Sequence, residues 1–512
     1  MTRQVIKLGS SSIASRDGLA LDVIAGLVSQ ISAAQRAGHE IILVTSGAAR
    51  LGRRLLAFEG PTAGAAPALQ ALVGAVRSSL SEASPGRGGR ASATPAGYGR
   101  LVASLREILQ QYDGPEGGPQ AVATGMPAAV GQPALMALYR QLAAAVGVEV
   151  CQILVSRSDL ASARAMADLG HLLREAAGRG LLPIVNGNDA ADPLSALDND
   201  QVAVAVAVAG EASRLLFLTD VRAAYRDSSL SERIVRLTPD EARAVRVTSG
   251  GSGRGGMGSK LGAAARAACC GVECVIGSAT EPDVVARSLN PRARVGTVIR
   301  GTGDQLEPSR RWIGGMAYSE GSVHVNRDAE ASLRSGSTLF LSGVKRIDGE
   351  FPAGSVVELV DVRHPERLIG RGSVALPASI LRLLRALSPH QVACAISILL
   401  RLRYAGAAAT GERAGAGVGL LDPDTYKDCR ELADGTSRAS QEAFAQLAAF
   451  SADRVSDLAD SLLLAQPGLY TAFLLDRGFL DGQMPMGHTV RRVVRNVHAV
   501  HRESLVVYPC SP

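Results

Sequence analysis

A glycine-rich stretch that ends in lysine is the strongest candidate for chemistry in this chain. It reads "GGSGRGGMGSK" from Gly250 to Lys260, and "MGSKLGAAARAACCG" continues it as a sequence typical of a helix. Backbone N–H groups of a glycine loop at a helix N-terminus bind anions, and a lysine adds positive charge. We therefore interpret the stretch as a phosphate-binding loop, with an ordinary flexible loop as the alternative.

Two better-known nucleotide motifs fit this stretch poorly. Gly251, Gly253 and Gly256 satisfy G-x-G-x-x-G, but a dinucleotide-binding fold needs a buried strand directly before that pattern. The preceding "DEARAVRVTSG" is polar and rich in arginine. A Walker loop has lysine before serine or threonine, whereas Ser259 precedes Lys260 here. The loop is therefore not predicted to be either motif.

Lysine is rare in this chain, so its positions are informative. The 54 basic residues include only four lysines, namely Lys7, Lys260, Lys345 and Lys427. A lysine ammonium is a compact point charge and an arginine is a wide planar fork, so the two do not substitute freely at a crowded phosphate site. Lys7 opens "KLGSS" at the end of an apolar run. We expect Lys7 and Lys260 to hold a transferring phosphoryl group, a reaction that needs mainly alignment and charge stabilisation.

Apolar runs alternate with alanine-rich helical segments and predict the elements that position these lysines. The expected strands are residues 4–9, 41–47, 148–155, 181–186, 214–220 and 272–277. A first helix is indicated by apolar residues at helical spacing from Val23 to Ile31, and Gly38 is expected to end it. This order predicts an α/β fold with a parallel sheet covered on both faces. Ligands bind beyond the carboxyl ends of such strands. We therefore expect the polar residues that end these strands to lie together at one edge of the sheet, namely Lys7, Ser46, Asn186 to Asp189, Thr219 and Asp220.

Length and composition limit the remaining options. A chain of 512 residues exceeds one ordinary domain, and 46% apolar residues suffice for a buried core. A formal charge of +6 does not indicate a nucleic-acid or membrane partner, and the longest apolar runs are too short to span a bilayer. The N-terminus lacks the apolar run of a signal peptide. The seven cysteines are scattered except for Cys269, Cys270 and Cys274, which we interpret as packing residues rather than a metal site. We expect a reduced, cytoplasmic setting.

Composition shifts predict the domain boundaries. The α/β domain is expected over residues 1–300, with a disordered insertion at about 58–123 that contains the low-complexity stretch at 84–99. Short β-rich runs predict a small domain at 308–385. A helix and linker are expected at 386–424, and a helical tail of unknown role at 425–512.

Seven motifs in one order carry a resemblance to a known family. They are "VIKLGSSSI", "LVTSGAA", "AAVGQPALMALYRQL", "PIVNGNDA", "LDNDQVAVAVA", "LLFLTDV" and "GRGGMGSKLGAA". In this order they resemble the glutamate 5-kinases of the amino acid kinase family, over about residues 3–300. "RRWIGG" and the segment from "GSVHV" to "GSVVEL" resemble the PUA domain that follows in that enzyme. The resemblance implies an amino acid kinase fold, a parallel-rich sheet between helices, followed by a PUA-like domain.

The resemblance also implies a reaction and a set of site residues. The family uses ATP with Mg²⁺ to phosphorylate the side-chain carboxylate of glutamate, the first step of proline biosynthesis. The acceptor is already a nucleophile, so no general base is needed. By resemblance the catalytic residues are Lys7, Lys260 and Asp200, and the substrate-binding residues are Ser46, Asp189 and Asn199. The ATP contacts are Lys7, Thr219, Asp220, Arg254, Gly255, Gly256, Met257 and Lys260. No metal ligand is assigned.

Ordinary structural roles are the alternatives for several of these residues. Asp189 and Asp200 have the residue type of helix N-caps, Ser46 could belong to a plain turn, and Thr219 with Asp220 could simply end a strand. The chain also departs from the family where Gly187 replaces a glutamate, Leu197 a glycine and Arg254 a threonine.

These departures leave two alternative functions open, namely a related kinase with another carboxylate acceptor and a non-catalytic regulatory or RNA-binding homologue. The expected partners are ATP and glutamate. A homo-oligomer is a further candidate, as is glutamyl phosphate reductase, whose N-terminal helices the tail faintly resembles. No RNA or membrane partner is expected.

Overall fold

The computed structural model describes residues 2–15, 18–57, 99, 102–103, 125–191, 198–226, 230–245, 256–290, 292–293, 295–301, 306–365, 367–385 and 498–508. The chain forms two compact units, Met1–Tyr318 with Pro509–Pro512, and Ser319–Tyr508. The predicted insertion at 58–123 lies outside the described residues except for residues 99, 102 and 103. The predicted helix and linker after residue 385 and most of the predicted tail also lie outside them.

An eight-stranded sheet forms the centre of the first unit, in the order β5-β6-β4-β1-β7-β9-β10-β8. The six strands from β5 to β9 in this order are all parallel, and β10 pairs antiparallel with β9 and parallel with β8. Their bounds are Arg3–Leu8 (β1), Glu40–Val44 (β4), Val150–Val155 (β5), Leu182–Gly187 (β6), Arg214–Thr219 (β7), Arg236–Leu237 (β8), Glu273–Ser278 (β9) and Thr297–Ile299 (β10). A separate hairpin pairs Ala14–Ser15 (β2) with Gly18–Leu19 (β3).

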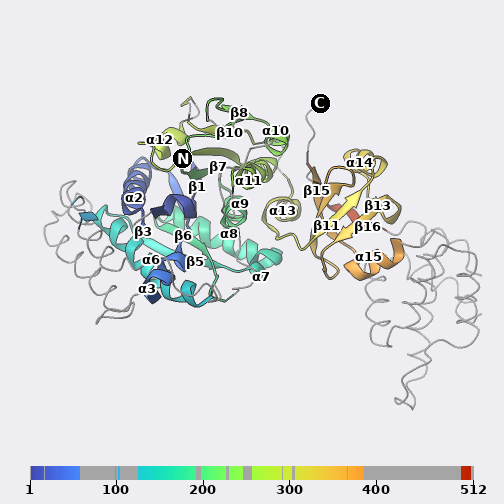
Figure 1. The fold of residues 1–512 in the computed structure, drawn as a ribbon, viewed down its shortest axis with the longest axis horizontal. Helices are drawn as coiled ribbons and strands as arrows, with labels where there is room; N and C mark the ends of the chain where they lie inside the picture. The colour runs from blue at the N-terminus through green and yellow to red at the C-terminus, as the bar shows by residue number, and fades with distance from the viewer. Residues whose placement is uncertain are drawn as a thin grey trace, which may run out of the picture. The chain divides into compact units, whose positions relative to one another are not determined.

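Helices cover both faces of this sheet, because its central strands are apolar on both sides (Figure 1). One face packs against Leu21–Arg36 (α2), Ala48–Ala57 (α3), Gly125–Ala145 (α6) and Val284–Leu289 (α12). The other packs against Arg157–Ala161 (α7), Ala163–Gly178 (α8), Asn199–Ala209 (α9), Pro239–Ala244 (α10) and Met257–Cys269 (α11). Strand residues alternate between the two cores, with Ile6 in the first and Val5 in the second. The predicted α/β class, a parallel-rich sheet between helices, is confirmed.

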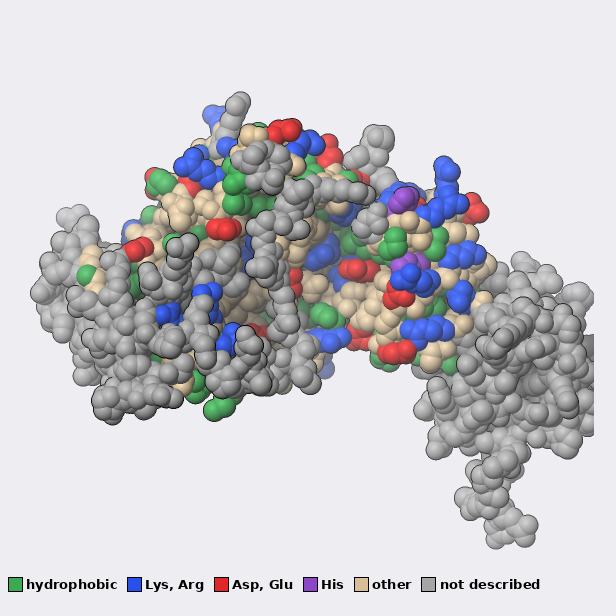
Figure 2. Space-filling model, viewed as in Figure 1, with side chains coloured by type: hydrophobic (Ala, Val, Ile, Leu, Met, Phe, Trp, Pro, Cys, Tyr) green, Lys and Arg blue, Asp and Glu red, His purple; other side chains and the backbone are tan. Residues whose placement is uncertain are grey.

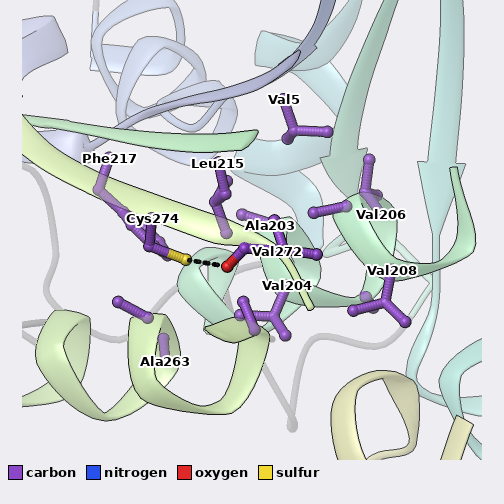
Figure 3. Packing of buried hydrophobic residues seen from close by; sticks show 14 of the residues in the cluster. Val5, Ala203, Val204, Val206, Val208, Leu215, Phe217, Ala263, Val272 and Cys274 are labelled. Carbon is purple, nitrogen blue, oxygen red and sulfur yellow. Dashed lines mark hydrogen bonds between the residues drawn. The ribbon is translucent and has the colours of Figure 1, made fainter. Parts of the chain in front are cut away.

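The second core is mainly aliphatic. Figure 3 shows Val5, Leu215 and Phe217 of the strands against Val204 and Val206 of α9. The alternating "VAVAVAVA" of α9 is buried all round, which explains why it is apolar without a polar face. Cys274 lies in the same core, where its thiol donates to the Val272 carbonyl, so this cysteine packs as a small apolar residue.

Local sequence explains how the first elements begin and end. In α2 the buried residues Leu21, Ile24, Leu27, Val28 and Ile31 recur at helical spacing. Gly38 follows with a φ of 86°, which glycine adopts readily. The predicted first helix and its end are therefore confirmed. The remaining short elements of this unit are Ser10–Ile13 (α1), Pro308–Arg311 (α13) and a π-helix at Trp312–Met316.

Glycines hold α3 and α6 close together. A Cβ on Gly52 would lie 1.7 Å from the Pro127 carbonyl oxygen, and one on Gly131 would lie 1.9 Å from that of Ala48. Any side chain at these two positions would force the helices apart. This contact fixes the position of Gln132, which follows Gly131 directly.

The second unit contains a six-stranded sheet in the order β12-β16-β15-β14-β11-β13. The strands are Ser322–Val325 (β11), Leu339–Phe340 (β12), Val344–Asp348 (β13), Val356–Asp361 (β14), Leu368–Val374 (β15) and His498–Val507 (β16). Helices Arg327–Arg334 (α14) and Ala378–Arg385 (α15) and a 3₁₀ turn at Leu341–Gly343 accompany them.

The last described segment corrects one prediction. We expected a helical tail over 425–512, but His498–Val507 forms β16, between β12 and β15. Apolar residues of this strand, Ala499, Val500, Leu505 and Val506, are buried, which favours a sheet position over an exposed helix. Across the described part of the chain, no helix is long and apolar enough to cross a membrane.

Candidate active site

One buried carboxylate lies between the two lysines that the sequence singled out. Lys7 Nζ is 2.6 Å from Asp200 Oδ1, and Lys260 Nζ is 3.3 Å from Asp200 Oδ2. All three residues are at most 5% exposed, and Asp200 is fully buried. The structure therefore brings together all three residues that the resemblance implied to be catalytic.

The three residues come from three elements that meet at the carboxyl edge of the sheet. Lys7 follows Ile6 in β1, so strand alternation directs it to the side of α9 and α11. Asp200 lies in the first turn of α9, and Lys260 in the first turn of α11. Two helix N-termini thus converge on the site and add partial positive charge.

A hydrogen-bond chain ties these helix N-termini together. Asp198 is the N-cap of α9, and its Oδ1 accepts the Asp200 N–H at 2.9 Å. The Ser259 hydroxyl of α11 donates to Asp198 Oδ2, also at 2.9 Å. Asp200 therefore lies inside the helix and the cap is Asp198, so the alternative of Asp200 as an N-cap is wrong. The sequence prediction did not include Asp198, which opens "DND", or Ser259, which directly precedes Lys260.

The electrostatics of the lysine cluster favour an anion. Two lysines share one carboxylate, so these three side chains together carry a net charge of +1. Buried positive charge of this kind attracts an anion. The N-cap of α11 is Gly256, which offers no side-chain bond to the first-turn N–H groups. A phosphate group fits this combination of a lysine cluster and an uncapped helix N-terminus.

A second pair of predicted residues meets beside the lysine cluster. Asn199 Nδ2 donates to Ser46 Oγ at 2.7 Å, and Asn199 immediately precedes Asp200. Gly47, after Ser46, has a φ of 101°, a conformation that favours glycine and sharply turns the chain from β4 into α3. Asn199 Oδ1 is buried and accepts no hydrogen bond from any residue that the structure describes. The two residues therefore form a polar pair with a buried acceptor that has no donor among the described residues.

Gln132 and Asn186 form a neighbouring polar pair at the end of β6. Asn186 Nδ2 donates to Gln132 Oε1 at 2.8 Å, and the Gln132 Nε2 group is buried without a hydrogen-bond partner among the described residues. The sequence prediction included Asn186 on this edge but missed Gln132. Its signal was a glutamine in an otherwise apolar stretch, "AAVGQPALMAL", of α6.

The remaining predicted site residues that the structure describes lie after β6, at the end of β7 and at the start of α11. Asp189 follows β6, is partly buried and does not cap a helix among the described elements. The Thr219 hydroxyl donates to Asp220 Oδ1 at 2.7 Å at the end of β7, which neighbours β1. Gly256 and Met257 begin α11. Arg254, Gly255 and Leu197 lie outside the described residues.

The element before the glycine-rich stretch is consistent with the rejection of a dinucleotide fingerprint. Residues Pro239–Ala244 form helix α10, with Thr238 and Glu241 in a capping box. A dinucleotide-binding loop would have a strand in that place. Within the part of the chain that the structure describes, no group of three or more His, Cys, Asp or Glu side chains could hold a metal ion.

Comparisons with known proteins agree with this geometry. The profile of the amino acid kinase family matches residues 2–278, and that of the PUA domain matches residues 321–389. A glutamate 5-kinase from Gloeobacter violaceus is 31% identical over 411 residues, which cover 78% of this chain and 95% of that protein. One from Myxococcus xanthus is 33% identical over 287 residues, covering 54% of this chain and 74% of that protein.

Among solved structures, the carbamate kinase from Giardia lamblia bound to AMP-PNP is similar with a TM-score of 0.37 and 13% sequence identity, over 59% of this chain and 99% of that one. The family profile covers more than half of the 512 residues, including Lys7, Asp200 and Lys260. The chain therefore belongs to the amino acid kinase family, with a PUA domain after its kinase domain.

Proposed function

We propose that this chain transfers the γ-phosphoryl group of ATP to the side-chain carboxylate of L-glutamate, which gives glutamyl 5-phosphate, the first step of proline biosynthesis. The observation that carries the proposal is the buried Asp200 carboxylate with a lysine on each oxygen. The relatives named glutamate 5-kinase support glutamate as the acceptor.

The reaction needs charge stabilisation and alignment rather than proton transfer. A carboxylate oxygen of glutamate bonds to the γ-phosphorus, and the bond from that phosphorus to the bridging oxygen breaks. ADP leaves with the electron pair. Because the acceptor is already ionised, no general base takes part. We assign to Lys7 and Lys260 the stabilisation of the negative charge that spreads over the transferring group and the leaving oxygen.

Asp200 acts as a positioning residue in this account. It holds both ammonium groups through short ion pairs, so neither lysine has to be ordered when ATP binds. Lysine side chains lose considerable rotamer entropy when they are fixed. Because Asp200 already holds both lysines before ATP binds, the entropic cost of reaching the transition state is lower.

The start of α11 is the proposed nucleotide site. The backbone N–H groups that follow Gly256 would bind ATP phosphates, with Met257, Thr219 and Asp220 as further nucleotide contacts. Arg254 and Gly255 are assigned to the same site by the resemblance alone. Mg²⁺ would arrive with ATP and share the charge of its phosphates, and we assign it no protein ligand.

Ser46, Asn199 and Asp189 are the proposed glutamate contacts. Asn199 Oδ1 is a buried acceptor and Gln132 Nε2 is a buried donor, each without a partner among the described residues. An α-amino acid carries an ammonium donor and carboxylate acceptors. It therefore supplies the partners that these two buried groups lack, since unpaired buried polar groups are costly.

ADP release in the presence of Mg-ATP tests the proposal directly. The wild-type chain should release ADP only when glutamate is present, and Lys7→Ala should lower kcat by about 100-fold or more, as the loss of a transition-state donor does. Lys345→Ala is the matched control, because Lys345 is exposed in the PUA unit. ADP release that does not depend on glutamate, or an equal loss in both variants, would contradict the assignment.

Gly187 is the observation that favours a second candidate, a kinase for a different carboxylate. It lies buried at the end of β6, where the resemblance implies a glutamate, and its N–H donates to Asn186 Oδ1 at 2.9 Å. A glycine there removes a negative charge from the acceptor side. The same assay with aspartate and N-acylated glutamate distinguishes the candidates, because the alternative predicts faster turnover with one of them than with glutamate.

The remaining proposals concern partners and location. A homo-oligomer remains a proposal. We also retain a functional link to glutamyl phosphate reductase, because an acyl phosphate hydrolyses readily and must be consumed soon after it forms. A cytoplasmic location fits a kinase that depends on ATP. We do not retain the non-catalytic alternative, because a chain that lost catalysis would not need Lys7, Asp200 and Lys260 assembled in this way.

A further inference from the structure

A cavity of about 250 Å³ lies in the kinase unit, at the edge of the sheet opposite the lysine cluster. Its lining includes Arg214 and Glu273, which are the first residues of β7 and β9. The lysine cluster lies instead at the carboxyl ends of the parallel strands, near Lys7. The cavity is therefore separate from the proposed catalytic site.

The lining of this cavity is mostly positively charged. Its lining contains one acidic residue, Glu273, and five arginines, namely Arg214, Arg236, Arg287, Arg292 and Arg300. Figure 2 shows basic side chains over the part of the surface where β8, β10 and α12 lie in Figure 1. Like charges gathered around one hollow repel each other, so an anion would stabilise this arrangement.

Two of the five arginines already have carboxylate partners. Arg214 Nη2 lies 2.7 Å from Glu273 Oε1, which neutralises the only acid in the lining. Arg287 pairs with Glu281, which lies outside the lining. The other three, Arg236, Arg292 and Arg300, are exposed, and their side chains have no ion-pair or hydrogen-bond partner in the described part of the chain.

The wall between these arginines is rigid. Arg214 donates to the Ser288 carbonyl, and Gln4 Nε2 donates to Ser288 Oγ at 2.8 Å, which fixes the end of α12 against the sheet. Gly296 has a φ of 52°, and a Cβ on it would lie 1.8 Å from the Ile276 carbonyl oxygen. This close approach fixes β10 against β9. The arginines therefore surround a preformed hollow rather than a loose surface.

We propose that this cavity binds a small phosphorylated molecule through its phosphate oxygens. Three guanidinium groups without a carboxylate partner among the described residues provide more positive charge than a single carboxylate would neutralise, and a phosphate carries up to two negative charges. The planar fork of arginine matches phosphate oxygens in pairs and forms charge-assisted hydrogen bonds with them. The volume suits a ligand of about the size of pyrophosphate.

Calorimetric titration of the full chain with inorganic pyrophosphate tests this site. One arm contains saturating AMP-PNP with Mg²⁺ to occupy the nucleotide site, and the other contains neither. Pyrophosphate should bind in both arms. Arg236→Gln with Arg300→Gln should weaken binding about tenfold or more, because two charge-assisted contacts are lost. The matched control is Arg164→Gln with Arg179→Gln, which removes two exposed arginines at α8 and should leave the affinity unchanged.

Two results would overturn the proposal. Pyrophosphate binding that disappears with AMP-PNP would show that pyrophosphate occupies the nucleotide site only. Equal affinity in the two double variants would show that the arginine cavity binds nothing. Both variants should keep the wild-type melting temperature, because the replaced side chains are exposed. If Arg236→Gln with Arg300→Gln unfolds, Arg292→Gln alone replaces it and should weaken binding at least about threefold.

Discussion

Replacement of Asp200 by asparagine tests how the lysine cluster is held together. Asp200→Asn keeps the shape of the side chain and removes its charge. In the wild-type chain the two ammonium groups lie 2.6 and 3.3 Å from the two carboxylate oxygens. In the variant, two buried ammonium groups would remain with no carboxylate between them.

The burial of these residues sets the size of the effect. Asp200 is 0% exposed, Lys7 is 4% and Lys260 is 5%, so water compensates little for the missing charge. Removal of one partner from a buried ion pair costs about 3 to 5 kcal/mol of the free energy of unfolding. In a unit of this size, about 2 °C in melting temperature corresponds to each kcal/mol, so we expect a fall of about 6 to 10 °C. We also expect kcat to fall by about 100-fold or more, because the lysines lose their common anchor.

Thermal unfolding by calorimetry and a kcat measurement on the same preparation give both numbers. Asp168→Asn is the control, because Asp168 is an exposed residue of α8 and its replacement should change stability by less than about 0.5 kcal/mol. Wild-type stability and wild-type turnover in Asp200→Asn would refute the reasoning, since they would mean that the buried carboxylate neither balances nor positions the lysines.

Three further predictions concern separate parts of the chain. Ser46→Ala removes the hydroxyl that accepts from Asn199 and should raise the KM for glutamate about two- to tenfold with little change in the KM for ATP; equal changes in both would contradict this. Deletion of residues 498–512 removes β16 from between β12 and β15, so limited proteolysis should cleave the PUA unit rapidly while the kinase unit resists; a resistant PUA unit would contradict the role of β16. Burial raises the pKa of the Cys269 thiol from 9.0 to about 11, so its thiolate fraction near pH 8 is about 100-fold lower than for an unshifted thiol and reaches one half only at about pH 11. Mass spectrometry of the peptide that contains Cys269 should therefore find iodoacetamide labelling slow at pH 8 and faster with rising pH; rapid labelling at pH 8 would contradict this.

Much of the kinase fold followed from local patterns. Short runs such as "IILV" and "RLLFLT" are apolar at consecutive positions, as expected of strands that are covered on both faces. Two strand pairings could not be predicted from local sequence patterns. The short strand β10 runs against its neighbour β9, and β16 joins β15 although residues 375–497 separate them in sequence. Pairing between distant segments is decided by tertiary packing, and no local periodicity encodes it.

The site could be predicted only in part. The scarcity of lysine, together with the glycine- and serine-rich motifs beside Lys7 and Lys260, indicated these two residues, because a point charge at a phosphate site is hard to replace by arginine. Only the resemblance indicated Asp200 as the acid that holds these lysines, because Asp200 lies 60 positions before Lys260 and on another helix, and no local pattern connects them. Gln132, Asp198 and Ser259 were missed for the same reason. Their roles depend on hydrogen bonds between elements that are distant in sequence rather than on their own sequence context.

Isotope transfer from glutamate tests the central claim most directly. Glutamate labelled with ¹⁸O in its side-chain carboxylate would be incubated with Mg-ATP and the enzyme, and the phosphate released from the acyl phosphate product by ring closure would be examined by ³¹P NMR. Attack by the carboxylate oxygen on the γ-phosphorus leaves one ¹⁸O in that phosphate, and this is the result we predict. Phosphate that contains only ¹⁶O would mean that water is the acceptor, which would contradict the assignment of this chain as a glutamate kinase.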